Sequence, residues 1–412
     1  MRKNLRLVLF FLGTFSLTTH IHAQNDRFAF AITDLEQTGA GWNALRRLDL
    51  QNGEYSKILL NGTNPSQVVF DASSRKAHIS VPDALYGNAM KPAFATGVAA
   101  MAYDKINKRL YFTPMFIDQL RYIDLKTMKL YYVTDQSFTG LGNMHNDEGK
   151  VVTRMVITPD GEGYAITNDA KTFIHFTTGK KLKITQLGSL VDDPENGGSI
   201  HNRCGSWGGD MVADDMGNLY IFTARNTVYK VNILTKVATH LKSIAGLPSG
   251  FTINGAVVND NNQVLVSSAA YDKAWYVVDP KTWTATQYKS ANGIYRSSDL
   301  ANSNYLTTGA RNYKEIAVVR KVANLPEKIM IYPNPVNNDQ FTIQFGKIPA
   351  GNYNIELTDV MGRIVMRQAI DVSYEDQAES VLLKKASAKG VYLVKVIDKD
   401  SKSIFTQKLV VQ

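Results

Sequence analysis

The stretches MVITPDGEGYAI (155–166) and MVADDMGNLYIF (211–222) decide the fold. Each is an apolar strand, a turn of Asp, Asn or Gly, and a second apolar strand, which is the pattern of a β-hairpin. The same unit recurs at roughly 40 to 56 residue spacings, as MAYDKINKRLYF from Met101, AVVNDNNQVLV from Ala256 and SSDLANSNYLTT from Ser297. Such regular recurrence predicts a repeat architecture.

Four of these units are followed by a second hairpin, so that one unit holds four short strands. The second hairpins read LRYIDLKTMKLYYV from Leu120, FIHFTTGKKLKITQL from Phe173, VYKVNILTKVATHL from Val228 and WYVVDPKTWTATQY from Trp275. A four-stranded unit cannot bury both faces by itself, but units stacked radially cover one another and leave only short edges. The repeats therefore predict an all-β fold, with a β-propeller over residues 27–322.

The number of units predicts six blades, with seven as the alternative. The N-terminal stretches FAFAITD and ALRRLDLQNGEYSKIL match the later part of the unit and are counted as one blade. A further match, VVFDASSRKAHIS from Val68, is either an insertion or half of a seventh blade. The first unit lacks an inner strand and the last lacks an outer hairpin. We therefore expect the first and last blades to meet and close the ring.

The composition is that of a folded protein that is exported. Of 412 residues, 44% are hydrophobic and 20% charged, which excludes disorder, collagen and coiled coil as the main organisation. Residues 1–23 have the pattern of a secretory signal peptide, with a basic start, an apolar core at 7–17 and the small Ala23 before the expected cleavage point. No apolar run is long enough to span a bilayer. Cys204 is the only cysteine, so the sequence predicts no intramolecular disulfide.

The positive charge of the chain is spread out. The formal net charge is +9, and the basic pairs are Arg75-Lys76, Lys108-Arg109 and Lys180-Lys181. These pairs are far apart in the sequence, which suits a solvated surface better than a stripe that contacts nucleic acid. The sequence therefore predicts no nucleic-acid partner.

The pattern changes after Leu325-Pro326. The remaining residues contain alternating strands broken by Pro, Asn and Gly, as in YPNPVNNDQFTIQF from Tyr332, YNIELTDVMGRIVMRQ from Tyr353 and GVYLVKVIDKDSKSIFTQKLVVQ from Gly390. This alternation predicts a small antiparallel β-sandwich. The expected organisation is a signal peptide at 1–23, a propeller domain at 24–325 and a C-terminal domain at 326–412.

The C-terminal segments resemble the type A C-terminal sorting domain of the type IX secretion system of Gram-negative bacteria. The matching features are Tyr332, Pro333, Asn334 and Pro335, the turn from Asp359 to Gly362 and Arg363, Gly390 and Tyr392 at the start of a strand, and Lys408 in the closing Lys-Leu-Val-Val. The resemblance implies export through the periplasm and recognition of the tail by the outer-membrane translocon. It also implies that the protein is released or anchored at the cell surface, often after removal of the tail.

Two loops align without a gap and indicate a candidate site. They read GNMHNDEGKVVTRMVI from Gly142 and GSIHNRCGSWGGDMVA from Gly198, so that His145 matches His201 and Asn146 matches Asn202. Both run into the first strand of a unit, and we expect them to lie side by side near the central channel. Two imidazoles and two carboxamides there could bind a polar ligand, or a metal if Asp147 or Asp210 supplies a carboxylate. The alternative, which the sequence favours, is turn chemistry in a duplicated blade, with the histidines packed between blades.

Charged residues at the start of the inner strands form a second candidate group. Arg154 aligns with Asp210 and less securely with Arg296. Since inner strands line the channel of a propeller, these charges are expected to face one another across its mouth, most simply as a structural ion pair. The functional alternative is a clamp for an anion or a carbohydrate, with Trp207 and Tyr295 as aromatic platforms.

These observations favour a noncatalytic module that binds an unknown extracellular ligand or protein, with no cofactor. The alternative is a metal-dependent propeller hydrolase or lactonase that acts on extracellular carbohydrate. Propellers that resemble the gluconolactonase type hold a divalent metal with an acidic and an Asn ligand from inner strands. A purely structural surface protein is the third interpretation. No P-loop, G-x-S-x-G, H-E-x-x-H or C-x-x-C motif is present, so no catalytic residue is assigned.

Overall fold

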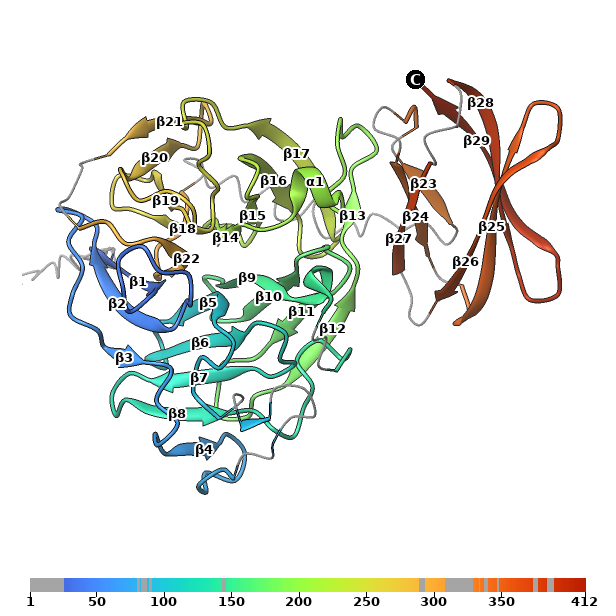
Figure 1. Ribbon diagram of the computed structural model, residues 1–412. Helices are drawn as coiled ribbons and strands as arrows, with labels where there is room; N and C mark the ends of the chain where they lie inside the picture. The colour runs from blue at the N-terminus through green and yellow to red at the C-terminus, as the bar shows by residue number, and fades with distance from the viewer. Residues whose placement is uncertain are drawn as a thin grey trace, which may run out of the picture.

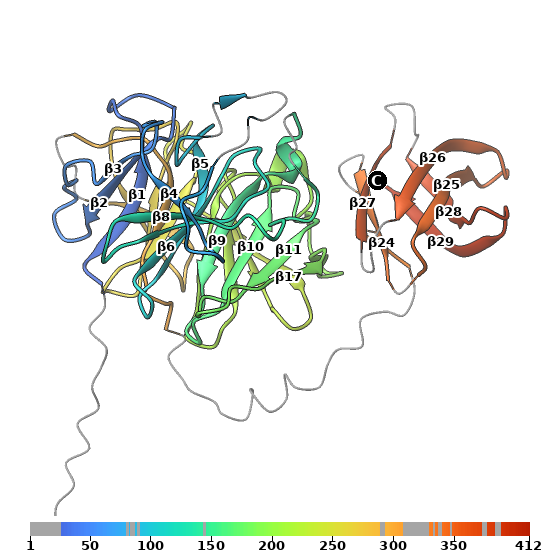
Figure 2. The same cartoon turned by 90° about the horizontal axis from the view of Figure 1, so that it is seen from below.

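The computed structural model describes residues 26–79, 82, 87–88, 91–142, 146–288, 293–307, 329–332, 334–336, 340–346, 348–372, 377–383 and 389–412. They form a ring of sheets and a β-sandwich beside it (Figure 1, Figure 2). The predicted signal peptide lies outside the described residues. The predicted boundary between 24–325 and 326–412 stays a prediction, because residues 308–328 are not described. In the part of the chain that is described, no helix is long and apolar enough to cross a membrane.

Five sheets of the described chain surround one axis, and the strands of each run from the innermost outward. The first is β22 (Ser297–Ala301), β1 (Phe28–Thr33), β2 (Ala44–Asp49) and β3 (Leu60–Asn61). The second is β5 (Val98–Asp104), β6 (Arg109–Pro114), β7 (Arg121–Asp124), β8 (Lys129–Tyr132) and β4 (Val69–Asp71). The third is β9 (Val152–Ile157), β10 (Gly163–Thr167), β11 (Phe173–Phe176) and β12 (Ile184–Gly188).

The remaining two sheets complete the ring. The fourth is β14 (Asp210–Ala213), β15 (Leu219–Phe222), β16 (Thr227–Val231), β17 (Val237–Ser243) and β13 (Val191–Asp192). The fifth is β18 (Gly255–Val258), β19 (Val264–Ser267), β20 (Tyr276–Asp279) and β21 (Thr284–Gln287). The innermost strands contact one another in the closed order β22, β5, β9, β14, β18 and back to β22. The predicted all-β propeller is therefore confirmed.

The ring closes with five sheets in the described residues, where the repeats predicted six or seven blades. The first and last predicted units are not two blades. They share one sheet, because β1 pairs antiparallel with β22 from the other end of the propeller, with Ile32 opposite Asp299. The extra match from Val68 is an insertion, since β4 adds to the outer edge of the second sheet beside β8. Each half-unit supplies the strands that the other lacks, and the two ends of the propeller meet as expected.

The core of the ring lies between neighbouring sheets. One cluster of buried side chains fills each junction: Phe30 and Phe112 pack between the first and second sheets, and Tyr111 and Phe176 between the second and third. Equivalent clusters fill the other three junctions. Because both faces of every sheet are covered, the strands carry apolar residues on both sides and the ring needs no disulfide.

The turns between the first and second strands of the blades are held by Asp and Asn side chains. The Asp214 carboxylate accepts hydrogen bonds from the backbone N–H groups of Met216 and Asn218, at 2.9 and 2.8 Å. The Asn259 side chain accepts the equivalent bonds from Asn261 and Gln263. These residues therefore serve the hairpin turns, as local side-chain hydrogen bonding explains.

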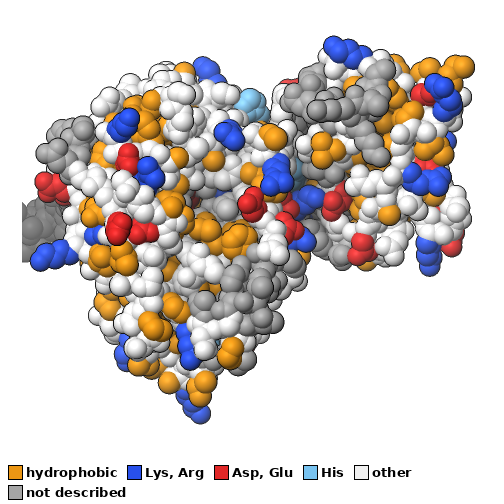
Figure 3. Space-filling view, viewed as in Figure 1, with side chains coloured by type: hydrophobic (Ala, Val, Ile, Leu, Met, Phe, Trp, Pro, Cys, Tyr) orange, Lys and Arg blue, Asp and Glu red, His pale blue; other side chains and the backbone are white. Residues whose placement is uncertain are grey.

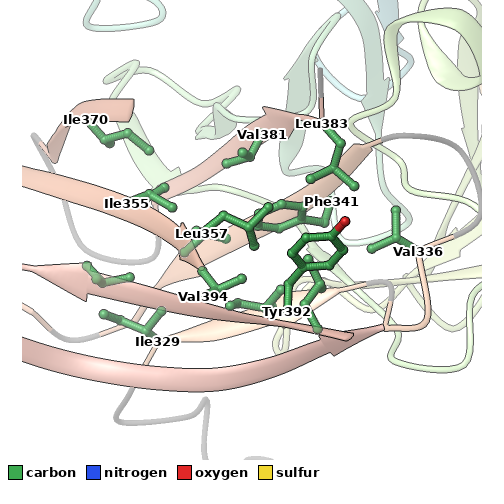
Figure 4. Close-up of a cluster of buried hydrophobic side chains, with 14 of the residues drawn as sticks. Ile329, Val336, Phe341, Ile355, Leu357, Ile370, Val381, Leu383, Tyr392 and Val394 are labelled. Atoms are coloured by element: carbon green, nitrogen blue, oxygen red, sulfur yellow. The ribbon is translucent and has the colours of Figure 1, made fainter. Parts of the chain in front are cut away.

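The C-terminal domain is a two-sheet sandwich. One sheet holds β23 (Met330–Tyr332), β24 (Gln340–Phe345) and β27 (Gln377–Leu382). The other holds β26 (Ile364–Val372), β25 (Gly351–Asp359), β28 (Gly390–Ile397) and β29 (Ser403–Val411). Apolar side chains from both sheets, such as Phe341, Leu357 and Val394, meet in one buried cluster (Figure 4). The predicted antiparallel sandwich is confirmed.

Candidate functional site

The two aligned loops border a cavity of about 880 Å³. On the propeller its walls come from residues 140–141 and 147–150 before β9, 169–172 between β10 and β11, and 201–207 before β14; residues of β24, β26 and β27 close it on the side of the C-terminal domain. Lys171 Nζ lies 2.8 Å from Glu379 Oε2 across this junction. Figure 3 shows acidic and basic side chains gathered where the two domains meet.

His201 lies in the wall of the cavity, but its ring is buried and both of its nitrogens are engaged. Nδ1 lies 2.7 Å from the carbonyl oxygen of Asp169, and Nε2 lies 3.1 Å from that of Leu190. Burial raises the pKa of the neighbouring Asp169 and Asp192 carboxyls, and the His201 ring opposes that rise. The imidazole thus connects the loop before β14 to the third sheet, and no ring nitrogen points to a ligand.

Trp207 presents the main aromatic surface of the cavity. Its ring packs over Gly149 of the neighbouring loop, where an added Cβ would lie 3.0 Å from the ring. Its Nε1 donates to the His201 carbonyl oxygen at 3.3 Å, and the Arg203 guanidinium lies 5.2 Å from the ring centroid. Asn202 caps the short helix α1 (Arg203–Ser206) by accepting from the N–H groups of Cys204 and Gly205. The ring itself is half-buried, so one part of it stays open to the cavity.

Arg154 supports the loop that carries Trp207 through hydrogen bonds to its backbone. The side chain is fully buried, and its guanidinium donates to the carbonyl oxygens of Ser206 at 2.5 Å and Gly208 at 2.7 Å. It also donates to the carbonyls of Thr167 and Asn168 in its own sheet. Burial lowers the pKa of Arg154 to about 10, which still leaves the side chain charged at neutral pH. Arg154 therefore positions the Trp207 loop and does not line a channel mouth.

The loop turns sharply just before β14, and glycine permits the turn. Gly209 has φ = 94°, and a Cβ at this position would lie 1.8 Å from the carbonyl oxygen of Phe222. Only a residue without a side chain fits such an approach. The next residue, Asp210, is thereby placed at the start of the innermost strand.

Asp210 is not in an ion pair with Arg154. Its carboxylate accepts from the backbone N–H groups of Met211 and Ala256, both at 2.7 Å, and so joins β14 to β18. Asp299 holds the equivalent position on β22, one residue before Leu300. Burial, together with the charge of Asp210, raises the pKa of Asp299 well above its usual range, and burial raises that of Asp210 as well.

The sequence alignment paired Arg154 with Arg296 and missed Asp299. The structure shows that Met101, Met155, Met211, Ala256 and Leu300 line one small cavity of about 20 Å³ at the centre of the ring. Asp299 directly precedes Leu300, as Arg154 precedes Met155 and Asp210 precedes Met211. Aligning the last unit on Leu300 would therefore have identified Asp299 from the sequence. The cavity has room for about one water molecule, and the walls at this level are mainly apolar.

Tyr295 and Arg296 belong to another part of the ring. The Arg296 side chain pairs with Asp272 at 3.2 Å, and the Tyr295 ring packs against Tyr55 and the Arg46 guanidinium. Neither residue lines the cavity beside Trp207. The structure thus separates the two aromatic platforms expected from the sequence.

The remaining predicted site residues are Asn146, which is exposed in the loop before β9, and His145, which lies outside the described residues. Among the residues that are described, no three His, Cys, Asp or Glu side chains gather into a group able to hold a metal ion. The predicted pairing of His145 with His201 therefore stays a prediction, because His145 lies outside the described residues.

The sorting-motif residues of the C-terminal domain meet in space. The Asn334 side chain donates to the Lys408 carbonyl oxygen at 2.7 Å and accepts from the Val410 N–H at 2.9 Å. The chain continues through the exposed Pro335 to Val336, whose N–H donates to the Val410 carbonyl oxygen at 2.7 Å. The first motif thereby fastens the last strand, although more than 70 residues separate them. Pro333 lies outside the described residues.

The other motif residues shape turns and the core. The Asp359 carboxylate accepts from the N–H groups of Met361 and Arg363 and pairs with the Arg363 guanidinium at 2.8 Å, around Gly362 at φ = 81°. Gly390 begins β28, and Tyr392 two residues later is buried in the core. The Tyr332 hydroxyl donates to the Gln344 side chain at 3.0 Å. The motif residues therefore build the sandwich, while Lys408 is exposed.

Comparison with known sequences identifies this domain. Residues 330–412 match the family described as the secretion system C-terminal sorting domain, which covers about a fifth of the chain. A search of curated protein sequences finds no match.

Solved structures with detectable similarity share little sequence with the chain. PorZ, a surface component of the type IX secretion system of Porphyromonas gingivalis, is 15% identical with a TM-score of 0.34 over 93% of this chain and 51% of that chain. The extracellular domain of BT3049 from B. thetaiotaomicron is 12% identical with a TM-score of 0.36, over 93% and 55%. The virginiamycin B lyase of Staphylococcus aureus is 9% identical with a TM-score of 0.33, over 93% and 94%. The chain thus spans about half the length of the first two.

The motif residues, the sandwich they build and the family match agree with one another. Together with the ring of sheets they establish both domains. The chain is a β-propeller protein that carries a type IX secretion C-terminal sorting domain and is exported to the surface or the surroundings of a Gram-negative cell.

Proposed function

We propose that the propeller is a noncatalytic module that binds a polar extracellular ligand, of the saccharide class, in the cavity beside Trp207. The observation that carries the proposal is a concave site of about 880 Å³ lined by one partly exposed indole ring, that of Trp207. This volume lies within the range of small-molecule sites, about 300 to 1,000 Å³. An indole face suits the apolar face of a sugar ring, and the charged rim supplies partners for hydroxyl groups.

The rim of the cavity offers donors and acceptors in alternation. Asp147 and Lys150 lie on one loop, with Lys150 Nζ 3.3 Å from the Asp147 carboxylate. Arg203 lies on the other loop, 3.4 Å from Glu148. These pairs are exposed and contribute little to stability, so they are free to exchange partners when a ligand enters.

A metal-dependent hydrolase in the central channel is not part of this proposal. Such an enzyme needs acidic or amide ligands that converge on an open channel. The described channel cavity holds about 20 Å³, and the side chains at its centre are Met101, Met155, Met211 and Leu300. These residues do not fit a metal, and no reaction step is assigned to them.

The proposal is tested by calorimetric titration of the full chain and of a chain ending at Leu325 with a panel of defined oligosaccharides. Trp207→Ala is expected to weaken binding at least about tenfold, because the stacking surface is lost. Tyr295→Ala is the matched control, since this aromatic residue lies outside the cavity. Equal losses in both variants, or no binding by either form of the wild-type chain, would show that the cavity is not a saccharide site.

A further inference from the structure

The fold brings together basic residues from three pairs that are scattered in the sequence. Arg75, Arg109, Lys180 and Lys181 line one cavity of about 300 Å³. Arg75 lies in the turn after β4, Arg109 begins β6, and the two lysines lie in the turn between β11 and β12. The lining therefore comes from the second sheet and from the turn between β11 and β12 of the third sheet, which follows it in the ring (Figure 1). It shares no lining residue with the cavity beside Trp207.

Aromatic rings and carbonyl groups hold the two arginines in place. The Arg75 guanidinium lies 4.9 Å from the Tyr131 ring centroid and donates to the Tyr122 hydroxyl at 2.7 Å. The Arg109 guanidinium lies 4.8 Å from the Tyr122 centroid and donates through Nη1 to the Thr178 carbonyl at 2.9 Å. The two tyrosines are stacked, with centroids 4.8 Å apart and an interplanar angle of 13°. The guanidinium groups are thus fixed before any ligand arrives.

The positive charge of this cavity is not neutralised by the protein. None of the four basic side chains forms an ion pair with a carboxylate of the described chain. Asp135 is the one acidic residue in the lining as described, and it is exposed. Four cations around a concave wall with one carboxylate produce a positive potential that attracts anions.

We propose that this cavity binds a phosphate or sulfate group carried by a small polar ligand. Planar guanidinium groups pair with the oxygens of such anions through two parallel hydrogen bonds, and the flexible lysines add charge from the rim. The volume exceeds that of one oxyanion, which leaves room for an attached sugar or polyol. Ser73 and Gln136 line the same cavity and offer hydrogen bonds to its hydroxyl groups.

The test measures binding to the full chain at low ionic strength, with inorganic phosphate, inorganic sulfate, glucose phosphate and glucose as probes. The triple variant Arg75→Gln, Lys180→Gln and Lys181→Gln is expected to bind the three anions about tenfold more weakly or worse. Glucose phosphate is expected to bind more tightly than inorganic phosphate, and uncharged glucose not detectably. Added salt should weaken binding, as for exposed charges.

The matched control is the triple variant Lys76→Gln, Lys108→Gln and Lys126→Gln. It removes the same charge from exposed residues on the same sheet, none of which lines the cavity. The control is expected to keep wild-type affinity for the anions, and both variants should melt within a few degrees of the wild type because the changed side chains are exposed. Equal loss in the control, or no binding of any anion by the wild-type chain, would overturn the proposal. Saturation of phosphate and glucose phosphate at the same affinity would overturn the part that concerns an attached sugar.

Discussion

At the scale of single residues, the buried imidazole of His201 fixes the position of the loop that carries Trp207. Its two nitrogens face carbonyl oxygens from two different segments, so the ring ties the Trp207 loop to the third sheet. We expect His201→Ala to lower the free energy of unfolding by about 2 kcal/mol, because the buried ring loses its packing and its polar contacts with the two carbonyl oxygens. Urea denaturation measures the loss.

The control for His201 is Asn146→Ala, a change at an exposed position of the other aligned loop. This variant is expected to shift the free energy of unfolding by less than about 0.5 kcal/mol. Divalent cations should leave the melting of wild type and both variants unchanged. A metal-dependent stabilisation that disappears in His201→Ala, or in His145→Ala, would instead identify the histidines as ligands.

The buried acid at Asp299 makes stability depend on pH. Burial raises its pKa in the folded state, so its contribution to stability is present below the unfolded value near 3.8 and is lost as pH rises through the folded pKa. Asp299→Asn keeps the shape without the charge. We therefore expect this variant to gain in melting temperature relative to wild type between about pH 4 and about pH 8, by about 2 °C or more.

Asp71 supplies a control of opposite sign for Asp299. Partial burial raises its pKa, but hydrogen bonds from Ser74, Thr134 and Ser73 outweigh this and lower the pKa below the usual value. Its contribution is present above the unfolded pKa and is lost as pH falls. Asp71→Asn should therefore cost more stability at about pH 6 than at about pH 2, because the contribution is lost below the unfolded pKa near 3.8. If the effect of both substitutions on stability changed with pH in the same direction, the raised pKa assigned to Asp299 would be contradicted.

At the scale of elements, the pairing of β1 with β22 decides whether the ring is closed. The two strands come from opposite ends of the propeller, and Ala31 lies opposite Leu300 in their register. Deleting residues 28–34 removes β1, so that β22 loses its partner strand and β2 keeps only β3. We expect the variant to lose cooperative melting, because an open ring exposes apolar faces and unpaired backbone.

Ile106→Ala is the control for the closing strand. This side chain is 72% exposed in the turn between β5 and β6, so its removal should leave the melting temperature within about 2 °C of wild type. Scanning calorimetry distinguishes the two cases. If the deletion variant melts like the wild type, the shared sheet does not close the ring.

At the scale of the whole molecule, the sorting domain has a hydrophobic core separate from those of the propeller. The propeller is closed by its own strands, and the sandwich has its own core. We therefore expect a chain ending at Leu325 to fold but to stay in the periplasm. Residues 326–412 fused to a foreign exported protein should carry it to the cell surface. Fractionation of cells and medium, followed by detection of each protein, measures the outcome.

A single substitution tests whether the attachment of the last strand is needed for sorting. Asn334→Ala removes both hydrogen bonds that fasten the last strand at Lys408 and Val410. It should reduce export of the fusion, whereas Lys402→Ala, at an exposed turn of the same domain, should not. Unchanged export of the truncated chain would show that the tail is dispensable for sorting.

Local chemistry in the sequence determined the strands, the Asp and Asn turns and the propeller class, and the resemblance of the C-terminal motifs to a known family indicated the sorting domain. Short-range periodicity and side-chain capping, as at Asp214, depend only on neighbours along the chain. The number of blades could not be predicted from local sequence, because the first and last half-units combine in one sheet only when the chain closes into a ring. The role of Arg154 did not follow either, since its carbonyl partners are set by the packing of two blades.

Only the tertiary structure decided which side chains meet. His201 and Trp207 are three-dimensional neighbours of the C-terminal domain, while Tyr295 is separated from them. Four basic residues from three pairs that look like solvated surface in the sequence line one cavity. The physical reason is the same in each case: residues far apart in the chain are brought together by the radial stacking of sheets, which local sequence patterns do not encode.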